Sequence, residues 1–138
     1  MLTLFPILIY MSLVQLNNNK TDKNTVHSYL PLYDILLKPI KNTSKNILEI
    51  GVHKGGSIKL WYDYFKKAMI YGCDKKDKVK IHKLKNKKRI VLKLNENAYT
   101  EEYIQKNFEN IKFDFLLDDG PHTLESQKKF IELYSPLL

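Results

Sequence analysis

The sequence predicts an α/β fold, a parallel sheet of about four strands with flanking helices. Short apolar runs of strand length alternate along the chain with stretches of helical periodicity. Each apolar run is followed by polar residues or glycines, and the first, 46–50, passes through three glycines into an amphipathic stretch. Strands that alternate with helices favour a parallel sheet with right-handed crossovers.

The composition describes one ordinary globular domain. The 138 residues are 43% hydrophobic and 28% charged, which suffices for a hydrophobic core. The single cysteine, Cys73, cannot form an internal disulfide. It therefore predicts a reducing compartment, the cytoplasm.

The charge of the chain is strongly basic and locally concentrated. The net charge is +8, and Lys75–Arg89 holds nine of the 23 cationic residues with Asp77 as its one acid. A positive field favours nucleic acid, anionic membranes or acidic small molecules. Because the excess sits in one segment, a solvated loop or helix surface is favoured over a nucleic-acid site.

Residues 1–16 are interpreted as an apolar N-terminal extension ahead of a domain spanning 17–138. The apolar run from Leu2 to Val14 contains Pro6, lacks a positively charged start and is too short to span a bilayer. A signal peptide or anchor is the less favoured alternative. Met11 offers another explanation, in which the functional protein starts there and residues 1–10 extend the reading frame upstream.

The chain then follows the predicted pattern in order. A helix begins near residue 27 and ends at Pro39, with an apolar stripe that we expect to lie over one face of the sheet. The stripe consists of Tyr29, Leu32, Tyr33, Leu36 and Leu37. The strand at 46–50 follows. After the glycines comes a helix that packs on the sheet through Ile58, Leu60, Trp61, Tyr64 and Phe65, with Trp61 assigned to core packing.

The second half continues the alternation. We expect strands at 69–73, 89–94 and 113–117, and a helix in the basic segment with Val79, Ile81 and Leu84 inward. Thr100 is a predicted N-cap, followed by Glu101 and Glu102, which suit the helix dipole. A last helix spans about 123–134. Its expected inward side chains are Leu124, Phe130, Ile131 and Tyr134.

Ligands of parallel sheets bind at the carboxyl ends of the strands. The predicted strands place Gly51–Gly56, Asp74, 95–98 and 118–122 there. The spacing of Gly51, Gly55 and Gly56 is neither the dinucleotide fingerprint nor a P-loop. Glu49 precedes the loop, and Asp74 ends the second strand, where a Rossmann-like fold presents a carboxylate to ribose hydroxyls.

These motifs together resemble the class I S-adenosylmethionine-dependent methyltransferases, in particular the mycinamicin- and macrocin-type sugar O-methyltransferases and the cephalosporin-hydroxylase-like group. The resemblance covers residues 20–138. It rests on Thr21-Asp-Lys23, His27-Ser-Tyr29, Pro31-Leu-Tyr33, Glu49-Ile-Gly-Val, Gly55-Gly-Ser57, Trp61, Tyr71-Gly-Cys-Asp74 and Asp118-Asp-Gly-Pro-His122.

The resemblance implies a cofactor site and an acceptor site. Glu49 and the backbone from Gly51 to Gly56 would hold the methionine part of S-adenosylmethionine, and Asp74 its ribose. The segment Asn97-Ala98-Tyr99 stands where the family has an Asp-Ala-Tyr that contacts adenine, with Asn97 in place of the aspartate. The implied cofactor-binding set comprises Glu49, Gly51, His53, Gly55, Gly56, Ser57, Asp74, Asn97, Ala98 and Asp118.

For catalysis, the resemblance implies that Asp119 binds a divalent metal, Mg²⁺, and that His122 is the general base for a sugar or other small-molecule hydroxyl. The alternative for Asp119-Gly-Pro-His122 is a plain turn, with His122 capping the last helix.

The family continues beyond the last helix into strands that complete the sheet, and one of these carries an acidic pair of the metal site. The resemblance therefore predicts an incomplete class I methyltransferase fold, C-terminally truncated, completed by a second chain or in a homo-oligomer. The alternative function is a non-catalytic cofactor-binding remnant, or a basic module that binds nucleic acid or a partner.

Overall fold

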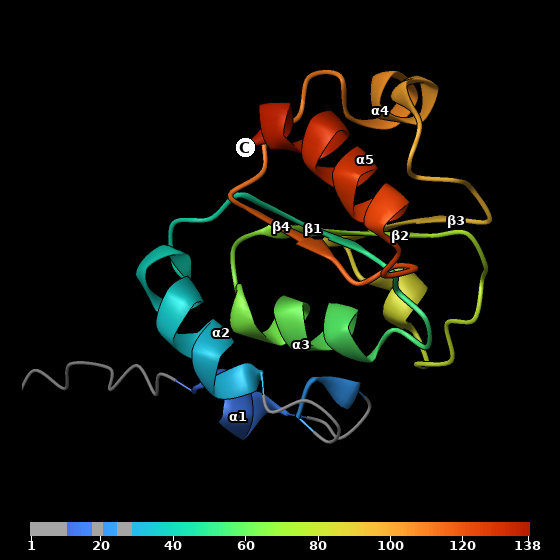
Figure 1. Cartoon of the computed structure of the whole chain (residues 1–138). Coiled ribbons are helices and arrows are strands. Elements are labelled where there is room, and N and C mark those ends of the chain that lie inside the picture. Colours follow the sequence, from blue (N-terminus) through green and yellow to red (C-terminus); the bar gives the residue numbers. More distant parts are fainter. Residues whose placement is uncertain (1–10, 18–20, 25–28) are drawn as a thin grey trace, which may run out of the picture.

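The computed structural model describes residues 11–17, 21–24 and 29–138. Four parallel strands form one sheet in the order β3-β2-β1-β4. Helices α1, α2 and α3 lie on one side of the sheet, and α4 and α5 lie on the other (Figure 1). The predicted α/β class is confirmed.

The strands are β1 (Asn46–Ile50), β2 (Met69–Asp74), β3 (Ile90–Leu94) and β4 (Phe115–Asp118). The helices are α1 (Leu13–Leu16), α2 (Leu30–Leu37), α3 (Gly56–Tyr64), α4 (Glu101–Phe108) and α5 (Leu124–Tyr134). Short 3-10 turns occupy Asp22–Asn24, Lys38–Ile40, Leu84–Asn86 and Ser135–Leu137.

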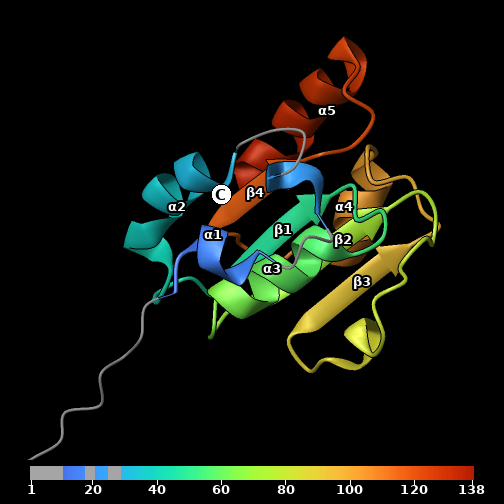
Figure 2. The same ribbon diagram turned by 90° about the horizontal axis from the view of Figure 1, so that it is seen from below.

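The strand order reverses beside β1. The chain builds β2 and β3 on one side of β1 and then returns to add β4 on its other side, as Figure 2 shows from below. Ile50 at the end of β1 is in register with Cys73 of β2 and Asp118 of β4. The carboxyl ends of these three strands are therefore level, at the position where such sheets bind ligands.

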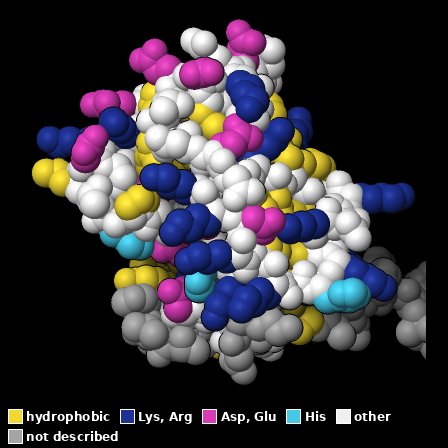
Figure 3. Space-filling view, turned by 90° about the vertical axis from the view of Figure 1, so that its right-hand side faces the viewer, with side chains coloured by type: hydrophobic (Ala, Val, Ile, Leu, Met, Phe, Trp, Pro, Cys, Tyr) yellow, Lys and Arg dark blue, Asp and Glu magenta, His cyan; other side chains and the backbone are white. Residues whose placement is uncertain are grey.

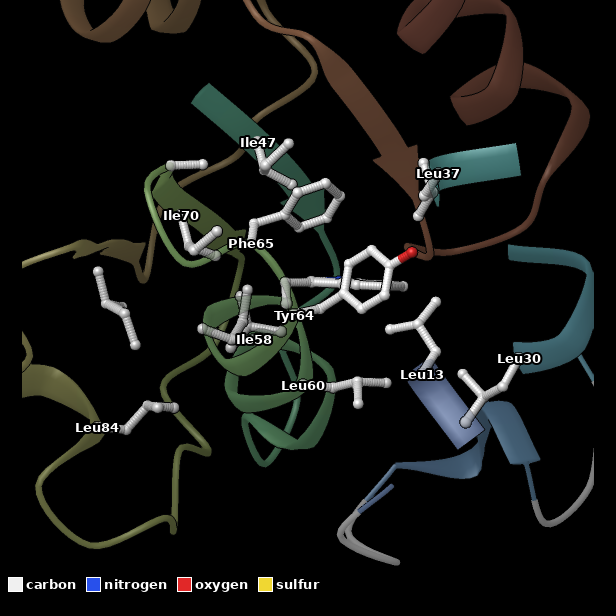
Figure 4. Packing of buried hydrophobic residues seen from close by; sticks show 14 residues of the cluster. Leu13, Leu30, Leu37, Ile47, Ile58, Leu60, Tyr64, Phe65, Ile70 and Leu84 are labelled. Carbon is white, nitrogen blue, oxygen red and sulfur yellow. The ribbon is translucent and has the colours of Figure 1, made fainter. Parts of the chain in front are cut away.

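Side chains of β1 alternate between two hydrophobic clusters, as the two-residue period of a strand requires. Ile47 joins the cluster beneath α3, and Leu48 joins the cluster beneath α4 and α5. Figure 4 shows the first cluster, in which side chains of α3 meet those of the sheet and of the N-terminal helices. Leu13 of α1 is fully buried there.

The second cluster is aromatic at its centre. The Phe108 ring meets the rings of Tyr71, Tyr103 and Phe113 edge-on, at centroid distances of 6.0, 5.8 and 5.4 Å. Such edge-to-face pairs are favourable because the positive ring edge meets the negative ring face. Phe108 is 1% exposed. This cluster holds α4 and α5 on the sheet.

The predicted helix starts agree with the structure. The Thr100 hydroxyl accepts a hydrogen bond from the Tyr103 backbone N–H, with Glu101 and Glu102 in the first turn of α4. Thr123 caps α5 in the same way, through the Ser126 N–H. Both caps satisfy donors that a helix leaves without partners.

The helix expected in the basic segment is wrong. After β2 the chain runs without an α-helix to the 3-10 turn at Leu84–Asn86. The Asp77 carboxylate accepts a hydrogen bond from the Val79 N–H two residues on, a local bond that competes with helix formation. Val79, Ile81 and Leu84 nevertheless pack on the core as expected.

Two apolar stripes also differ from expectation. In α5, Leu124 and Ile131 are 70% and 64% exposed, because the helix packs through Phe130 and the buried Tyr134. Three side chains of α2 and its N-cap that were expected to face inward are exposed: Tyr29 at the N-cap, and Leu32 and Leu36 in the helix. Leu37 is buried as expected, and Leu30, which was not part of the predicted stripe, is buried as well. Helix α2 packs chiefly on α1 rather than directly on the sheet.

The N-terminal interpretation falls partly outside the described residues. Residues 1–10 and 25–28 are not among them. The division at residue 16 and the start at Met11 stay predictions. Among the helices of the described residues, none has the length and apolar character needed to cross a membrane.

Replacement of Phe108 by alanine is expected to lower the free energy of unfolding by about 3–5 kcal/mol, because it removes the ring at the centre of the aromatic cluster. Ile131→Ala is the matched control, since that side chain is 64% exposed, and it should change stability by less than about 0.5 kcal/mol. Urea denaturation followed by circular dichroism measures both. Equal losses in the two variants would contradict this account of the core.

Candidate functional site

A cavity of about 1050 Å³ opens at the carboxyl edge of the sheet. Its walls come from segments that follow all four strands and from the N-terminal turn that contains Lys23. Figure 3 faces this edge and shows lysine and arginine side chains across it, with acidic side chains and histidines between them. Of the predicted site residues, the cavity wall includes Gly51, His53, Gly56, Ser57, Asp74, Asn97, Ala98, Asp119 and His122.

The loop between β1 and α3 forms the floor of this cavity. Gly51 has a φ of +96°, and its N–H donates to the Cys73 carbonyl at 2.8 Å. A Cβ atom at Gly51 would lie 2.1 Å from the Asp119 carbonyl oxygen. Only glycine permits this backbone approach, so residue 51 brings the β1 loop against the loop after β4.

Gly55 has a different neighbour. It also has a positive φ, +90°, and precedes the first residue of α3. A Cβ atom there would lie 2.6 Å from a methyl group of Leu84. The basic segment thus packs on the back of the glycine loop, and Gly55 itself does not line the cavity.

Asp74 presents a fixed carboxylate to the cavity. One oxygen accepts a hydrogen bond from the His53 N–H at 2.8 Å, and the other accepts from the Lys76 N–H at 2.9 Å. These bonds tie the glycine loop to the turn after β2. Each carboxylate oxygen can still accept a further hydrogen bond from a ligand hydroxyl.

The loop after β3 supplies Asn97, Ala98 and Tyr99. The Asn97 side-chain oxygen accepts from the Tyr99 N–H at 3.2 Å, and the Ala98 carbonyl accepts from the buried Tyr134 hydroxyl at 2.7 Å. Tyr99 donates its hydroxyl hydrogen to Asp118 at 2.5 Å. Asp118 lies outside the wall of the large cavity and lines a smaller one, of about 290 Å³.

Glu49 lies beneath the loop rather than in the cavity wall. It is fully buried, and its Oε2 accepts a hydrogen bond from Trp61 Nε1 at 3.1 Å. Burial raises the pKa of Glu49, while the Lys23 ammonium and the Ser57 hydroxyl oppose that shift. Trp61 therefore packs in the core as predicted and also orients this carboxylate.

Asp119 connects two charged side chains. Its Oδ2 forms an ion pair with Lys23 Nζ, and its Oδ1 lies 3.4 Å from His122 Nε2. His122 is 64% exposed and adopts a φ of +58°, at the rim of the cavity. The structure thus brings Asp119 and His122 together, as the catalytic interpretation requires, whereas the expected alternative cap is wrong, because Thr123 rather than His122 caps α5.

The basic segment forms one wall of the cavity through Lys75, Lys80, Ile81 and His82. The Lys80 N–H donates to the Lys54 carbonyl at 3.2 Å, which joins this wall to the glycine loop. The sequence analysis favoured a solvated surface for the basic segment and did not predict this wall. The segment reaches the glycine loop through a contact between Leu84 and Gly55, which are far apart in sequence. The nucleic-acid interpretation of the segment stays a prediction.

No family model matches the chain. Curated relatives include a mycinamicin VI 2''-O-methyltransferase of Micromonospora griseorubida, 31% identical over 104 residues, which are 70% of this chain and 25% of that protein. A demethylmacrocin O-methyltransferase of Streptomyces fradiae is 28% identical over 108 residues, which are 73% of this chain and 26% of that protein. The chain is a homologue of sugar O-methyltransferases.

The structural comparison agrees. The MycE methyltransferase of mycinamycin biosynthesis, solved in complex with Mg, SAH and mycinamycin VI, superimposes with a TM-score of 0.80 at 25% identity. The match covers 94% of this chain and 35% of MycE. The chain thus has the Rossmann-like fold of these enzymes and spans about a quarter of the length of the curated relatives that it matches.

Sequence reasoning gave Lys23 no role, and it gave Tyr99 only an implied place in the Asn97-Ala98-Tyr99 segment that would contact adenine. Thr21-Asp-Lys23 contributed to the resemblance, but a lysine in a polar stretch carries no signal that it will be 4% exposed. Tyr99 follows Asn97 and Ala98, and nothing in the local pattern indicates its bond to Asp118, 19 residues later.

Gly51→Ala should destabilise the protein more than Gly55→Ala. Both positions have a positive φ, so alanine at either costs roughly 1–3 kcal/mol of backbone strain. At Gly55 the new methyl group meets the end of a leucine side chain, which can move, but at Gly51 it meets backbone. Thermal unfolding of the two variants tests the difference. A Gly51→Ala protein as stable as Gly55→Ala would contradict the close approach to Asp119.

Cys73 should be unreactive in the folded protein. Burial raises the pKa of its thiol to about 12, opposed by the hydrogen bond from the Tyr103 hydroxyl, so almost no thiolate forms at pH 8. Ellman's reagent should react at least roughly a hundredfold faster after unfolding in guanidinium, with Cys73→Ser as the blank.

The same shift predicts a loss of stability at alkaline pH. The contribution of the protonated thiol is complete below the pKa of an unfolded cysteine, about 8.5, and is lost as the pH rises through the folded value. Denaturation midpoints between pH 8 and 11 should fall less in Cys73→Ser. Fast thiol reaction in the native state would contradict the burial.

Proposed function

We propose that this chain contains the cofactor-binding part of an S-adenosylmethionine-dependent O-methyltransferase that acts on a sugar or another hydroxyl-bearing small molecule. The observation that carries the proposal is a single cavity at the carboxyl edge that is lined both by the Gly51 turn and by the Asp74 carboxylate, which the His53 N–H holds in place. The kinship with sugar O-methyltransferases supports the same reaction class.

The residues present suit this cofactor. A cavity of about 1050 Å³ can enclose a nucleoside with an amino-acid tail. Asp74 offers oxygens to the ribose hydroxyls, and the loop around Ala98 and Asn97 borders the space expected for adenine. The Gly51–Gly56 backbone would hold the methionine part, with Glu49 orienting the loop from below. Bound S-adenosylmethionine supplies an electrophilic methyl group on its sulfonium.

The acceptor side is assigned to Asp119 and His122. An exposed imidazole at the rim can take the proton of an acceptor hydroxyl as that oxygen becomes a nucleophile. Asp119, 3.4 Å from Nε2, can orient the imidazole and stabilise its protonated form. Rigid strand ends supply the alignment that methyl transfer needs.

The Mg²⁺ implied by the resemblance is held by the related MycE. The described residues of this chain do not form such a site. Within 11–17, 21–24 and 29–138, no group of three His, Cys, Asp or Glu side chains is arranged for a metal ion, and Asp119 is paired with Lys23. Mg²⁺ prefers six oxygen ligands, so Asp119 alone is insufficient.

Two further assignments follow from weaker observations. Cys73 is free and buried, which supports a reducing, cytoplasmic location that cell fractionation would test. In the described sheet β4 is an edge strand, which supports pairing with a second chain or with another copy in a homo-oligomer. A monomer at all concentrations in sedimentation experiments would argue against the homo-oligomer.

Calorimetric titration with S-adenosylhomocysteine tests the cofactor site. The wild-type chain should bind, and Asp74→Asn should weaken binding about tenfold, because a charge-assisted hydrogen bond to ribose becomes a neutral one. Asp77→Asn is the matched control, since that carboxylate lies three residues on, pairs with Lys85 and is outside the cavity wall.

Two results would refute the cofactor assignment. One is an absence of binding by the folded wild-type chain. The other is equal weakening by Asp74→Asn and Asp77→Asn, which would point to a general effect of charge.

A further inference from the structure

The ammonium group of Lys23 is a buried charge that the proposed function does not use. Lys23 belongs to the 3-10 turn Asp22–Asn24, which reaches the carboxyl edge of the sheet from the N-terminal side. Its side chain is 4% exposed. Lysine is almost never buried to this extent unless its charge is paired.

Two carboxylates share this ammonium. Nζ lies 3.1 Å from Glu49 Oε1 and also pairs with Asp119 Oδ2. Glu49 is in β1, and Asp119 follows the last residue of β4, the neighbouring strand. Lys23 thus connects the carboxylate below the cofactor loop to the carboxylate that contacts His122.

The electrostatics of the three groups favour a permanent positive charge on Lys23. The Lys23 side chain is 4% exposed and lies within ion-pair distance of two carboxylates, so its ammonium form offsets their negative charge, whereas a neutral amine would not. If the ammonium were removed, the fully buried Glu49 and the partly exposed Asp119 would lose the counter-charge that they share. Carboxylates in that arrangement attract another cation strongly.

We propose that Lys23 is the built-in counter-cation of this site. Its ammonium holds Asp119, and through Asp119 the His122 imidazole, in a fixed place relative to the glycine loop. It also occupies Asp119 Oδ2, so a divalent ion and Lys23 compete for the same carboxylate. Lys23 is a positioning residue, because it acts through Asp119 and His122. Its positioning role rests on the proposed function, whereas the competition with metal does not.

Manganese binding tests the competition directly, because free Mn²⁺ is counted by its electron paramagnetic resonance signal. The wild-type chain should bind no more Mn²⁺ than Asp119→Asn. Lys23→Met, which keeps the length of the side chain and removes its charge, should bind Mn²⁺ about tenfold or more tightly than the wild type. The gain should vanish in the double variant Lys23→Met/Asp119→Asn.

Lys59→Met is the matched control, because Lys59 also pairs with a carboxylate, Asp63, but on the side of α3 and with 33% of its side chain exposed. It should leave Mn²⁺ binding unchanged. Lys23→Arg keeps the charge and should likewise show no gain. Circular dichroism of each variant verifies folding.

Two outcomes would overturn the proposal. One is Mn²⁺ binding by the wild type that Asp119→Asn abolishes, a comparison that remains decisive even if Lys23→Met does not fold. The other is a folded Lys23→Met that binds no better than the wild type. Absence of S-adenosylhomocysteine binding by the wild type would refute the cofactor assignment but not the competition between Lys23 and metal, since the Mn²⁺ measurements do not involve that ligand.

Discussion

The contact between Gly51 and the Asp119 carbonyl is the constraint on which the site depends. It holds the loop after β1 against the loop after β4, the two strands that lie side by side where the sheet order reverses. A side chain at position 51 would force the loops apart. Because the loops touch, the loop after β1 and the Asp119–His122 segment border one cavity rather than two separate surfaces.

Charge is distributed around that contact in two layers. At the base of the cavity one ammonium, that of Lys23, serves two carboxylates: Glu49, which is fully buried beneath the loop, and Asp119, which is partly exposed in the cavity wall. Above it, Asp74 and His122 border the cavity and remain accessible to a ligand. The lower layer fixes positions, because buried charges keep their partners. Asp74 and His122 can form hydrogen bonds to a ligand, as the proposed binding and proton transfer require.

The sequence predicted the fold well where local rules dominate and less well where packing decides. The strands and the Thr100 cap depend on short apolar runs and on one hydroxyl, and both were predictable. The conformation of the basic segment and the buried faces of α2 and α5 were less predictable, because the neighbouring elements decide which side of a helix is buried. Phe130 and Tyr134 of α5 pack in the aromatic cluster as predicted, but Leu124 and Ile131, which were assigned to the same helical face, are 70% and 64% exposed.

By itself the sequence determined the alternation of strands and helices, the glycine loop and the acids at the strand ends. Those features follow from backbone preferences and from the periods of secondary structure, which are local properties of the chain. Only the tertiary structure decided which of the strand-end residues share a cavity, that Glu49 lies beneath it and that Lys23 is buried between two carboxylates. These outcomes join residues as far apart as 23 and 119, whose proximity depends on the strand order and the level ends of β1 and β4.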